Sequence, residues 1–321
     1  MKNILIRIGF FCILIITGSL VFKYFTFSTD TSKQKEKDYY QNYVNEHYKV
    51  FAVNIEDSLF FLGERVPIDM EDIKERFDRE LLVNVYWQSQ TLLFYKRANK
   101  FFPIIEPILK EYGVPDDFKY LSLTESGLMN VVSPAGAAGY RQFLKKTAPE
   151  YGLEVNSEVD ERYHIEKSTV AFCKYMLDAY KQFNDWTLSA ASYNMGIAGL
   201  RNQITRQGVN NYYDLLLNEE TGRYVFRILA VKEILTNPNK YGFYFRPQDL
   251  YSMDEYSIVK VDGEVKDFSK FAFENGINYK ILKVLNPWLR QSYLRNTKGK
   301  TYEIKIPTKG YYSITKQDTI L

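Results

Sequence analysis

The chain has 321 residues, of which 45% are hydrophobic and 25% charged, so it can bury a large core and is not a disordered protein. This length suits two domains, or one large domain with an appendage. The net charge is +3 and no run of five or six like charges occurs. We therefore expect no nucleic-acid partner, since such proteins usually carry a basic stripe.

Cysteine and histidine are too scarce for the usual metal sites. With only Cys12 and Cys173, a zinc site of the cysteine type is excluded. A disulfide between them would tie an apolar N-terminal segment to a folded core, so none is expected. His47 and His164 lack partners at ligand spacing, and we interpret both as ordinary surface or satisfied residues. The prediction is no metal and no cofactor.

Residues 1–23 are predicted to be a membrane anchor or a secretory signal. Lys2 and Arg7 precede a long apolar run that ends at Lys23. The run is close to bilayer-spanning length, no A-x-A cleavage pattern follows it, and Cys12 lies in its middle rather than at a lipoprotein-like position. An uncleaved anchor is therefore favoured over a cleaved signal. Either way, the rest of the chain is expected to be exported to the cell envelope, in the periplasm.

Residues 24–69 are predicted to be a linker and an arm. The first part is polar with little periodicity, typical of a linker that lifts the body off a membrane. The stretch "FAVNIEDSLFFLGERVPID" (51–69) has short alternating runs and one glycine, which indicates an extended or short helical arm packed against the main domain.

Residues 70–242 are predicted to form an all-α domain of about eight helices. Apolar residues recur at three- and four-residue spacing from Met70, with Pro103 and Pro107 as punctuation and Gly113 as the end. A short helix, "DDFKYLSLTE", places Glu125 at its C-terminal end. An amphipathic helix covers 167–183, and the next runs from an Asp185 N-cap to Gly196. A further helix follows "LNEE" and closes at Asn-Pro; the region contains no convincing strand.

Residues 250–310 are predicted to form a small β-α-α-β module. The stretches "EYSIVKV" and "TYEIKIP" alternate and are rich in β-branched residues, as strands are. Two short helices, "KDFSKFAFENG" and "NYKILKVLNP", lie between them. The predicted fold is therefore mainly α, with a small α+β module at its C-terminal side.

Glu125 is the candidate catalytic group. A carboxylate at the end of a largely apolar helix feels desolvation and the negative end of the helix dipole, and both favour its protonated form. A carboxylic acid kept neutral near pH 7 can act as a general acid. The alternative is a solvated helix-end glutamate. The turn "SPAGAAGYRQF" (133–143) follows, and its small residues let backbone approach a ligand or pack a tight turn between helices. Gln142 is expected on the first turn of a following helix.

A series of blocks resembles the family-1 lytic murein transglycosylases, in particular the membrane-bound lytic transglycosylase D group. They occur in the family's order: Glu125-Ser126, "SPAGAAGYRQF" (133–143), "TAPEYGL" (147–153), "DER" (160–162), "SYNMG" (192–196) and "ETGRYV" (220–225). The resemblance covers residues 70–242 and implies a lysozyme-like α domain that cleaves peptidoglycan strands without water.

The resemblance implies that Glu125 first protonates the glycosidic oxygen between N-acetylmuramic acid (MurNAc) and N-acetylglucosamine (GlcNAc). It then takes the proton of the muramic C6 hydroxyl, which attacks C1 to give a 1,6-anhydro product. One carboxylate in two successive roles explains the missing partner acid. Other residues carried over by resemblance are the substrate-binding Ser126, Ser133, Gln142, Tyr193, Asn194 and Tyr224, with Gly136 and Glu220 in structural support.

The chain departs from the family at Arg141, where a large apolar residue is usual, and at Ser192, where alanine is usual. The arginine is interpreted as an altered cleft wall or an added contact to a peptide carboxylate. The C-terminal module resembles a LysM domain, a fold that binds GlcNAc-containing glycans. Its usual Gly-Asp-Thr is replaced by "DGEVKDF", so a packing-only module is the alternative.

Two other functions compete with the transglycosylase. One is a glycan-binding scaffold that kept the fold and lost turnover, for which Arg141 argues weakly. The other is a muramidase that uses water and needs a second carboxylate. The candidates for that second acid are Asp116, Asp117, Asp160 and Glu161. Expected partners are peptidoglycan glycan strands and, through the N-terminal segment, a membrane; the sequence names no protein partner.

Overall fold

The computed structural model describes residues 16–23, 35, 37–39, 41–46, 49–253 and 255–308. The chain divides into two units, Met1–Ala52 and Val53–Leu321. In the first unit, residues 16–23 are helical and exposed. Within the described residues, no helix is long and apolar enough to cross a bilayer. Most of the predicted anchor lies outside the described residues, namely residues 1–15, which include Cys12. His47 also lies outside them.

The second unit begins with a hairpin of two short strands, β1 (Leu59–Phe61) and β2 (Glu64–Val66), which pair antiparallel. The predicted arm is thus extended, and it packs against the helices as expected. The Leu62 amide donates to Asp117 Oδ2 at 2.8 Å, and the Trp186 amide donates to Glu64 Oε1 at 3.0 Å.

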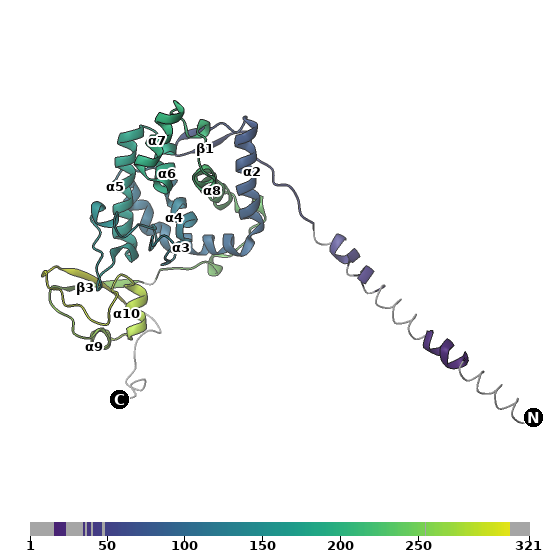
Figure 1. The fold of residues 1–321 in the computed structure, drawn as a ribbon. Coiled ribbons are helices and arrows are strands. Elements are labelled where there is room, and N and C mark those ends of the chain that lie inside the picture. The colour runs from purple at the N-terminus through teal and green to yellow at the C-terminus, as the bar shows by residue number, and fades with distance from the viewer. Residues whose placement is uncertain are drawn as a thin grey trace, which may run out of the picture. The chain divides into compact units, whose positions relative to one another are not determined.

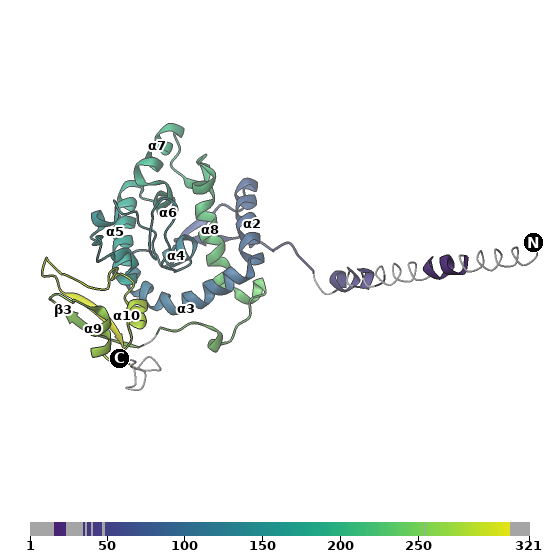
Figure 2. The ribbon, with the colours of Figure 1, turned by 60° about the horizontal axis from the view of Figure 1, so that its bottom comes forward.

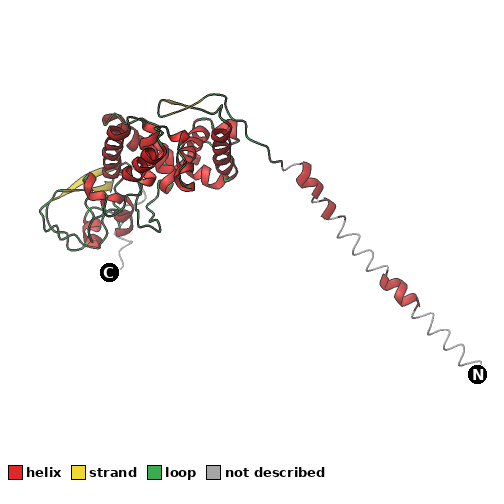
Figure 3. Cartoon of the chain, turned by 45° about the horizontal axis from the view of Figure 1, so that its top comes forward, coloured by secondary structure: helices red, strands yellow, loops and turns green. Residues whose placement is uncertain are grey.

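Helices fill the region after the hairpin (Figure 3). The α-helices are α2 (Glu71–Tyr86), α3 (Gln88–Glu111), α4 (Phe118–Ser126), α5 (Ile165–Phe183), α6 (Trp186–Met195), α7 (Ile197–Gln207) and α8 (Glu219–Thr236). Short 3-10 turns lie at Ala148–Tyr151, Glu161–Tyr163, Tyr212–Asp214, Pro238–Tyr241 and Pro247–Asp249. The predicted mainly α fold is confirmed, and no named strand occurs among residues 70–242, all of which the structure describes.

Local signals set several helix ends as expected. Asp185 accepts the Leu188 amide at 2.6 Å as the N-cap of α6, which ends at Gly196. Pro103 and Pro107 do not punctuate the helical pattern as predicted, because both lie inside α3. The break comes earlier, at Trp87, whose backbone (φ −90°, ψ 59°) separates α2 from α3.

Helix α8 lies centrally, in contact with α2, α4 and α6 (Figures 1 and 2). Its buried residues include Tyr224, Val225, Phe226 and Ile228, which belong to the main hydrophobic core. This arrangement brings the "ETGRYV" block at the start of α8 beside the C-terminal end of α4, where Glu125 lies.

The C-terminal module has the predicted order: β3 (Tyr256–Val261), α9 (Phe268–Glu274), α10 (Tyr279–Leu285) and β4 (Tyr302–Pro307). The two strands pair antiparallel, with Tyr256 opposite Pro307 and Val261 opposite Tyr302. Phe268, Leu282 and Ile304 are fully buried in its core.

The module's core continues into the helical domain. Ala138, Val159 and Tyr163 are buried in the same cluster as Trp288 and Leu289 of the module. Val159 forms a β-bridge with Leu289. These residues therefore share one hydrophobic core across the predicted domain boundary.

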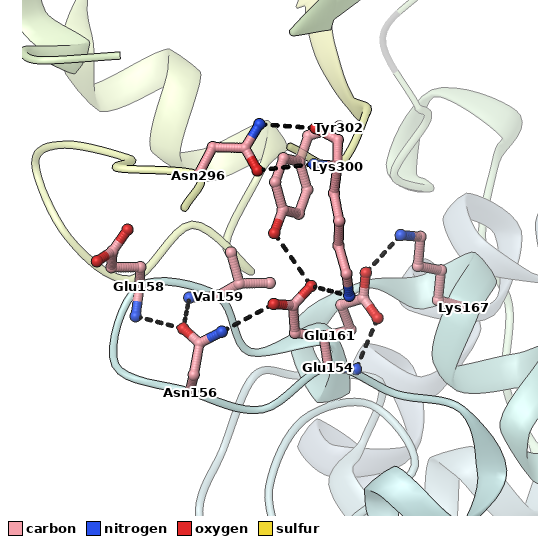
Figure 4. Close-up of polar contacts among 9 residues, drawn as sticks. All are labelled: Glu154, Asn156, Glu158, Val159, Glu161, Lys167, Asn296, Lys300 and Tyr302. Carbon is pink, nitrogen blue, oxygen red and sulfur yellow. Dashed lines mark hydrogen bonds and ion pairs between the residues drawn. The ribbon is translucent and has the colours of Figure 1, made fainter. Parts of the chain in front are cut away.

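Polar contacts also join the module to the helical domain (Figure 4). Lys300 Nζ lies 2.9 Å from Glu154 Oε2, and the Tyr302 hydroxyl donates to the same oxygen at 3.1 Å. Nearby, the Arg295 amide and Nε donate to Glu158 at 2.8 and 2.5 Å. The module is thus held to the segment 154–163 by charged as well as apolar contacts.

Candidate active site

Glu125 lies on the last turn of α4, as predicted. Apolar residues of this helix, including Leu121 and Leu123, are buried and fix it against the core. Gly127 closes the helix in the left-handed region at φ 60°, a conformation that glycine adopts without strain. The Glu125 side chain therefore points out of a short, well-anchored helix that ends immediately after it.

Tyr224 of α8 meets this carboxyl group directly. Its hydroxyl donates a hydrogen bond to Glu125 Oε1. Tyr224 is only 2% exposed, and burial raises the pKa of its phenol well above the ordinary value, so the phenol stays protonated and serves as a donor. The predicted contact between Tyr224 and Glu125 is therefore present.

Burial raises the pKa of Glu125 above its usual value. The Tyr224 hydrogen bond and the positive charge of Arg227 oppose this rise, and Glu220 adds to it. Because desolvation is the largest effect, the protonated carboxyl group is favoured relative to an exposed glutamate. A group in this state can give up a proton as a general acid.

Glu125 lines a pocket of about 500 Å³. The other walls come from α2, α3, α8 and the segments next to them, and the lining residues include Asn84, Trp87, Gln90, Met129, Arg223 and Arg227. Trp87 is 58% exposed, and a flat, accessible aromatic face at a pocket is suited to a sugar ring. Sequence reasoning missed these residues; the only signal was the "ETGRYV" block, which includes Arg223.

A second carboxylate, Glu80, also lines the pocket. It is 1% exposed, and Arg79 Nη1 lies 2.5 Å and Arg223 Nε 2.7 Å from its Oε1. Two cations therefore hold Glu80. Sequence reasoning did not single out this residue.

Ser126 and Tyr193 brace the turn that follows α4. The Ser126 hydroxyl donates to the Tyr140 carbonyl at 2.8 Å and itself lines the pocket. The Tyr193 hydroxyl donates to the Arg141 carbonyl at 2.6 Å. Both side chains thus fix the backbone next to Glu125, while their roles as substrate ligands stay predictions.

The turn is held by its own polar groups and by Arg162. The Ser133 hydroxyl accepts the Ala137 amide at 3.0 Å, and Gln142 Nε2 donates to the Gly139 carbonyl at 2.8 Å. Gly136, at φ 82°, offers its carbonyl to Arg162 Nη1 at 3.2 Å. Gly136 thus takes part in the contact between the turn and Arg162, and its supporting role stays a prediction. Ser133 and Gln142 are not among the pocket-lining residues, and substrate binding by them stays a prediction.

The prediction that Gln142 begins a helix was wrong. Its φ is 53°, and the chain around it forms turns and isolated bridges, with Ala138 paired to both Val132 and Phe143. A left-handed residue cannot start a right-handed helix, so the helical pattern that follows is overridden locally.

Arg141 does not face the pocket, which corrects the interpretation as a cleft wall or a carboxylate contact. It is fully buried, with its guanidinium 4.1 Å from the Phe172 ring centroid. Nη1 donates to the Phe118 carbonyl at 3.3 Å, whereas Nε and Nη2 have no hydrogen-bond partner among the residues that the structure describes. Desolvation lowers the pKa of Arg141 to about 10. The residue fills core space behind the turn.

Asn194 and Glu220 connect α6 to α8. Asn194 Nδ2 donates to Glu220 Oε1 at 3.0 Å, and its Oδ1 accepts from the Thr221 hydroxyl at 2.7 Å. Glu220 thus contacts another helix of the domain, and its supporting role stays a prediction. Asn194 is not among the pocket-lining residues, so its contact to substrate stays a prediction.

The four candidate second acids bind other parts of the protein. Asp116 pairs with Lys119, Asp117 with Lys232, Asp160 with Arg162, and Glu161 with Lys167. None of the four lines the pocket that holds Glu125. The muramidase alternative therefore gains no support from these positions.

With this geometry in place, comparison with known families defines the class. Residues 102–216 match the model of the transglycosylase SLT domain, and residues 257–310 match the soluble lytic transglycosylase C-terminal LysM-like domain. The resemblance to lytic murein transglycosylases is thereby confirmed.

The particular relatives agree with that class. The chain is 27% identical, over 259 residues, to membrane-bound lytic murein transglycosylase D of Escherichia coli strain K12, covering 78% of this chain and 55% of the relative. The same values hold for the protein of that name from E. coli O6:H1. The chain thus spans about half the length of the curated relatives it matches. A solved structure of an inactive variant of lytic transglycosylase Slt from Pseudomonas aeruginosa aligns with TM-score 0.34 and 18% identity over 48% of this chain and 26% of that one.

Proposed function

We propose that this protein is a peptidoglycan lytic transglycosylase that cleaves the β-1,4 bond between MurNAc and GlcNAc and leaves 1,6-anhydroMurNAc ends. The observation that carries the proposal is the setting of Glu125. Its pKa is raised by burial, Tyr224 donates to it, and it lines a pocket of about 500 Å³. The relatives that this chain matches are named as lytic murein transglycosylases.

The proposed reaction uses one carboxyl group twice. Protonated Glu125 gives its proton to the glycosidic oxygen, and the bond from that oxygen to muramic C1 breaks. The resulting carboxylate removes the proton of the muramic C6 hydroxyl while O6 bonds to C1. Glu125 ends protonated, so no water is consumed and no second acid is required. Tyr224 holds Oε1 in place through both steps.

The nearest alternative is hydrolysis with Glu80 as the second carboxylate, because Glu80 lines the same pocket. Arg79 and Arg223 both contact its Oε1, so this oxygen is already engaged, which argues against Glu80 as the base. A non-catalytic scaffold would have no need for an acid with a raised pKa.

The C-terminal module is proposed to assist binding to glycan strands, in line with its LysM-like match. We also propose that the protein works in the cell envelope, on the periplasmic side of a membrane that holds its N-terminal segment. The relatives' description as membrane-bound supports that location.

The test is digestion of purified sacculi followed by mass analysis. The wild type is expected to release 1,6-anhydro muropeptides, and Glu125→Gln to lower that release by about 10²- to 10⁴-fold, the usual contribution of a general acid. Glu150→Gln, the same change at an exposed position, is the control. Reducing ends in place of anhydro ends would establish hydrolysis. Strand binding without any release would establish a scaffold.

Glu125→Gln should fold normally. Because the folded-state pKa of Glu125 is raised, its stabilising contribution is complete below the unfolded-state pKa and is lost as pH rises through the folded-state pKa. A glutamine keeps the neutral shape at every pH. Its denaturation midpoint near neutral pH should therefore equal or exceed that of the wild type, which separates lost chemistry from lost folding.

A further inference from the structure

Arg227 is a pocket residue to which the mechanism above gives no task. It stands on α8 three residues after Tyr224, so both side chains project from the same face of the helix. It lines the pocket together with Glu125 and is close enough for its charge to lower the Glu125 pKa. Among the described residues it makes a single hydrogen bond, from Nη2 to the Thr124 carbonyl, which is long at 3.4 Å.

The other pocket arginine differs in its partners. Arg223 donates to Glu80 at 2.7 Å and to Glu219 at 3.2 Å, so its charge is matched by two carboxylates. Within the part of the chain that the structure describes, Arg227 forms no ion pair of this kind. Arg227 is half-buried and lines the pocket, and its other guanidinium N–H groups have no hydrogen-bond acceptor among the described residues.

The proposed chemistry increases this difference between the two arginines. The first step needs Glu125 protonated, and a neutral Glu125 no longer offers a negative charge to Arg227. Glu80 cannot serve, because Arg79 and Arg223 already hold it. A partly desolvated guanidinium gains most from a carboxylate, which can accept two of its N–H groups side by side.

We propose that Arg227 binds a carboxylate of the substrate, carried by the lactyl-linked substituent of muramic acid. The inference rests on the proposed function and makes it more specific. Sugar rings of the strand are neutral, so the carboxylate comes from the peptide stem or, on strands without stems, from the lactyl group itself. Arg227 would thus distinguish muramic-acid-containing strands from neutral N-acetylglucosamine polymers.

The test measures binding without turnover, in the Glu125→Gln background. Three soluble ligands are compared: glycan oligomers with peptide stems, the same oligomers with free lactyl carboxylates after stem removal, and neutral chito-oligosaccharides. Adding Arg227→Gln is expected to weaken binding of a carboxylate ligand by about 10- to 100-fold, as loss of a charged hydrogen-bonded pair does. Chito-oligosaccharide binding should be unchanged. Comparing the first two ligands identifies which carboxylate is bound.

Two further variants sharpen the measurement. Arg227→Lys keeps the charge but not the paired donors, so its loss should be intermediate. Arg206→Gln removes an exposed positive charge on α7 and should change nothing. The ligand carboxylates can also be removed, by converting them to carboxamides while Arg227 is kept. This change should weaken binding to the Glu125→Gln protein by a similar factor.

Equal binding of capped and uncapped ligands would overturn the assignment of Arg227, even if the wild type forms anhydro products. An equal loss for carboxylate and neutral ligands in Arg227→Gln would also overturn it, since the residue would then act on the pocket as a whole. If the protein neither binds strands nor releases product, the proposed function fails first and this inference fails with it.

Discussion

At the scale of single residues, the side chains around Glu125 determine its pKa more than its place on the helix does. Desolvation favours the protonated form of Glu125, which gives its proton in the first step. Tyr224 and Arg227 both stabilise the ionised form. The two opposing influences allow one carboxyl group to give and then regain a proton.

Replacing Tyr224 with phenylalanine tests this balance. Because the hydroxyl donates to Glu125 and lowers its pKa, Tyr224→Phe should raise that pKa and move the alkaline limb of the activity profile to higher pH. Turnover at the optimum should fall about tenfold or more, since the carboxylate loses its donor in the second step. Rates of anhydro-product release across pH check both effects. An unshifted profile would show that the hydroxyl does not act on Glu125.

Arg141 belongs to the core despite its charge, and the consequence is measurable. Two of its nitrogens are buried without a partner in the described part of the chain, which costs stability. Arg141→Met should therefore leave the free energy of unfolding unchanged or raise it by about 1 kcal/mol, as when buried charges are replaced by apolar side chains. Sacculus digestion should stay near the wild-type rate. Urea unfolding gives the first value, and a loss above about 2 kcal/mol would contradict the argument.

At the scale of elements, the small-residue turn is shaped by close backbone approach. Gly139 has φ 79°, and a Cβ placed there would lie 1.9 Å from the Arg162 carbonyl oxygen. The turn and the segment 154–163 are therefore in direct contact, and Arg162 also donates to the carbonyls of Gly136 and Phe143. The short sequence "SPAGAAG" permits this contact because it lacks large side chains.

Gly139→Ala should destabilise the protein by at least about 3 kcal/mol, because strain at positive φ adds to a backbone collision that no side chain can relieve. Gly136→Ala is the matched control. Its φ is 82°, but nothing lies within 4 Å of the added carbon, so only the conformational cost of about 1–2 kcal/mol applies. Denaturant unfolding of both variants measures the difference; equal losses would mean that the collision is relieved by movement.

The sequence predicts most elements here but not their neighbours in space. Capping at Asp185, the end of α4 and the β-α-α-β order all follow from local signals. The helix expected at Gln142 fails because tertiary contacts from Arg162 hold the turn in another shape. Trp87 and Arg227 escape sequence reasoning because periodicity does not say which helices pack together around a pocket.

At the scale of the whole molecule, the C-terminal module behaves as part of the folded unit and not as a tethered accessory. Val159 and Tyr163 are buried with module residues such as Trp288. The Asp160 amide donates to the Trp288 carbonyl at 2.9 Å, and Asp160 in turn holds Arg162. A path of contacts thus runs from the module through the segment 154–163 to the turn beside Glu125.

A chain that stops at residue 252 should consequently be less stable. Removing the module exposes Ala138, Val159 and Tyr163, which should lower the free energy of unfolding by several kcal/mol. A loss of this size corresponds to a melting temperature lower by about 10 °C. A chain that stops at residue 308 retains every described module element and is the control. Thermal unfolding and limited proteolysis compare the two. Equal melting temperatures would show that the helical domain is independent of the module.

The nearness of Arg227 to Glu125 links ligand binding to proton uptake. Because the guanidinium lowers the Glu125 pKa, an anion that neutralises it must raise that pKa and draw a proton from solution. By the same coupling, protonation of Glu125 tightens binding of the anion. A strand with a carboxylate at this position would therefore promote protonation of Glu125 when it binds. Because the proton comes from the buffer, the measured binding enthalpy would vary with the ionisation enthalpy of the buffer.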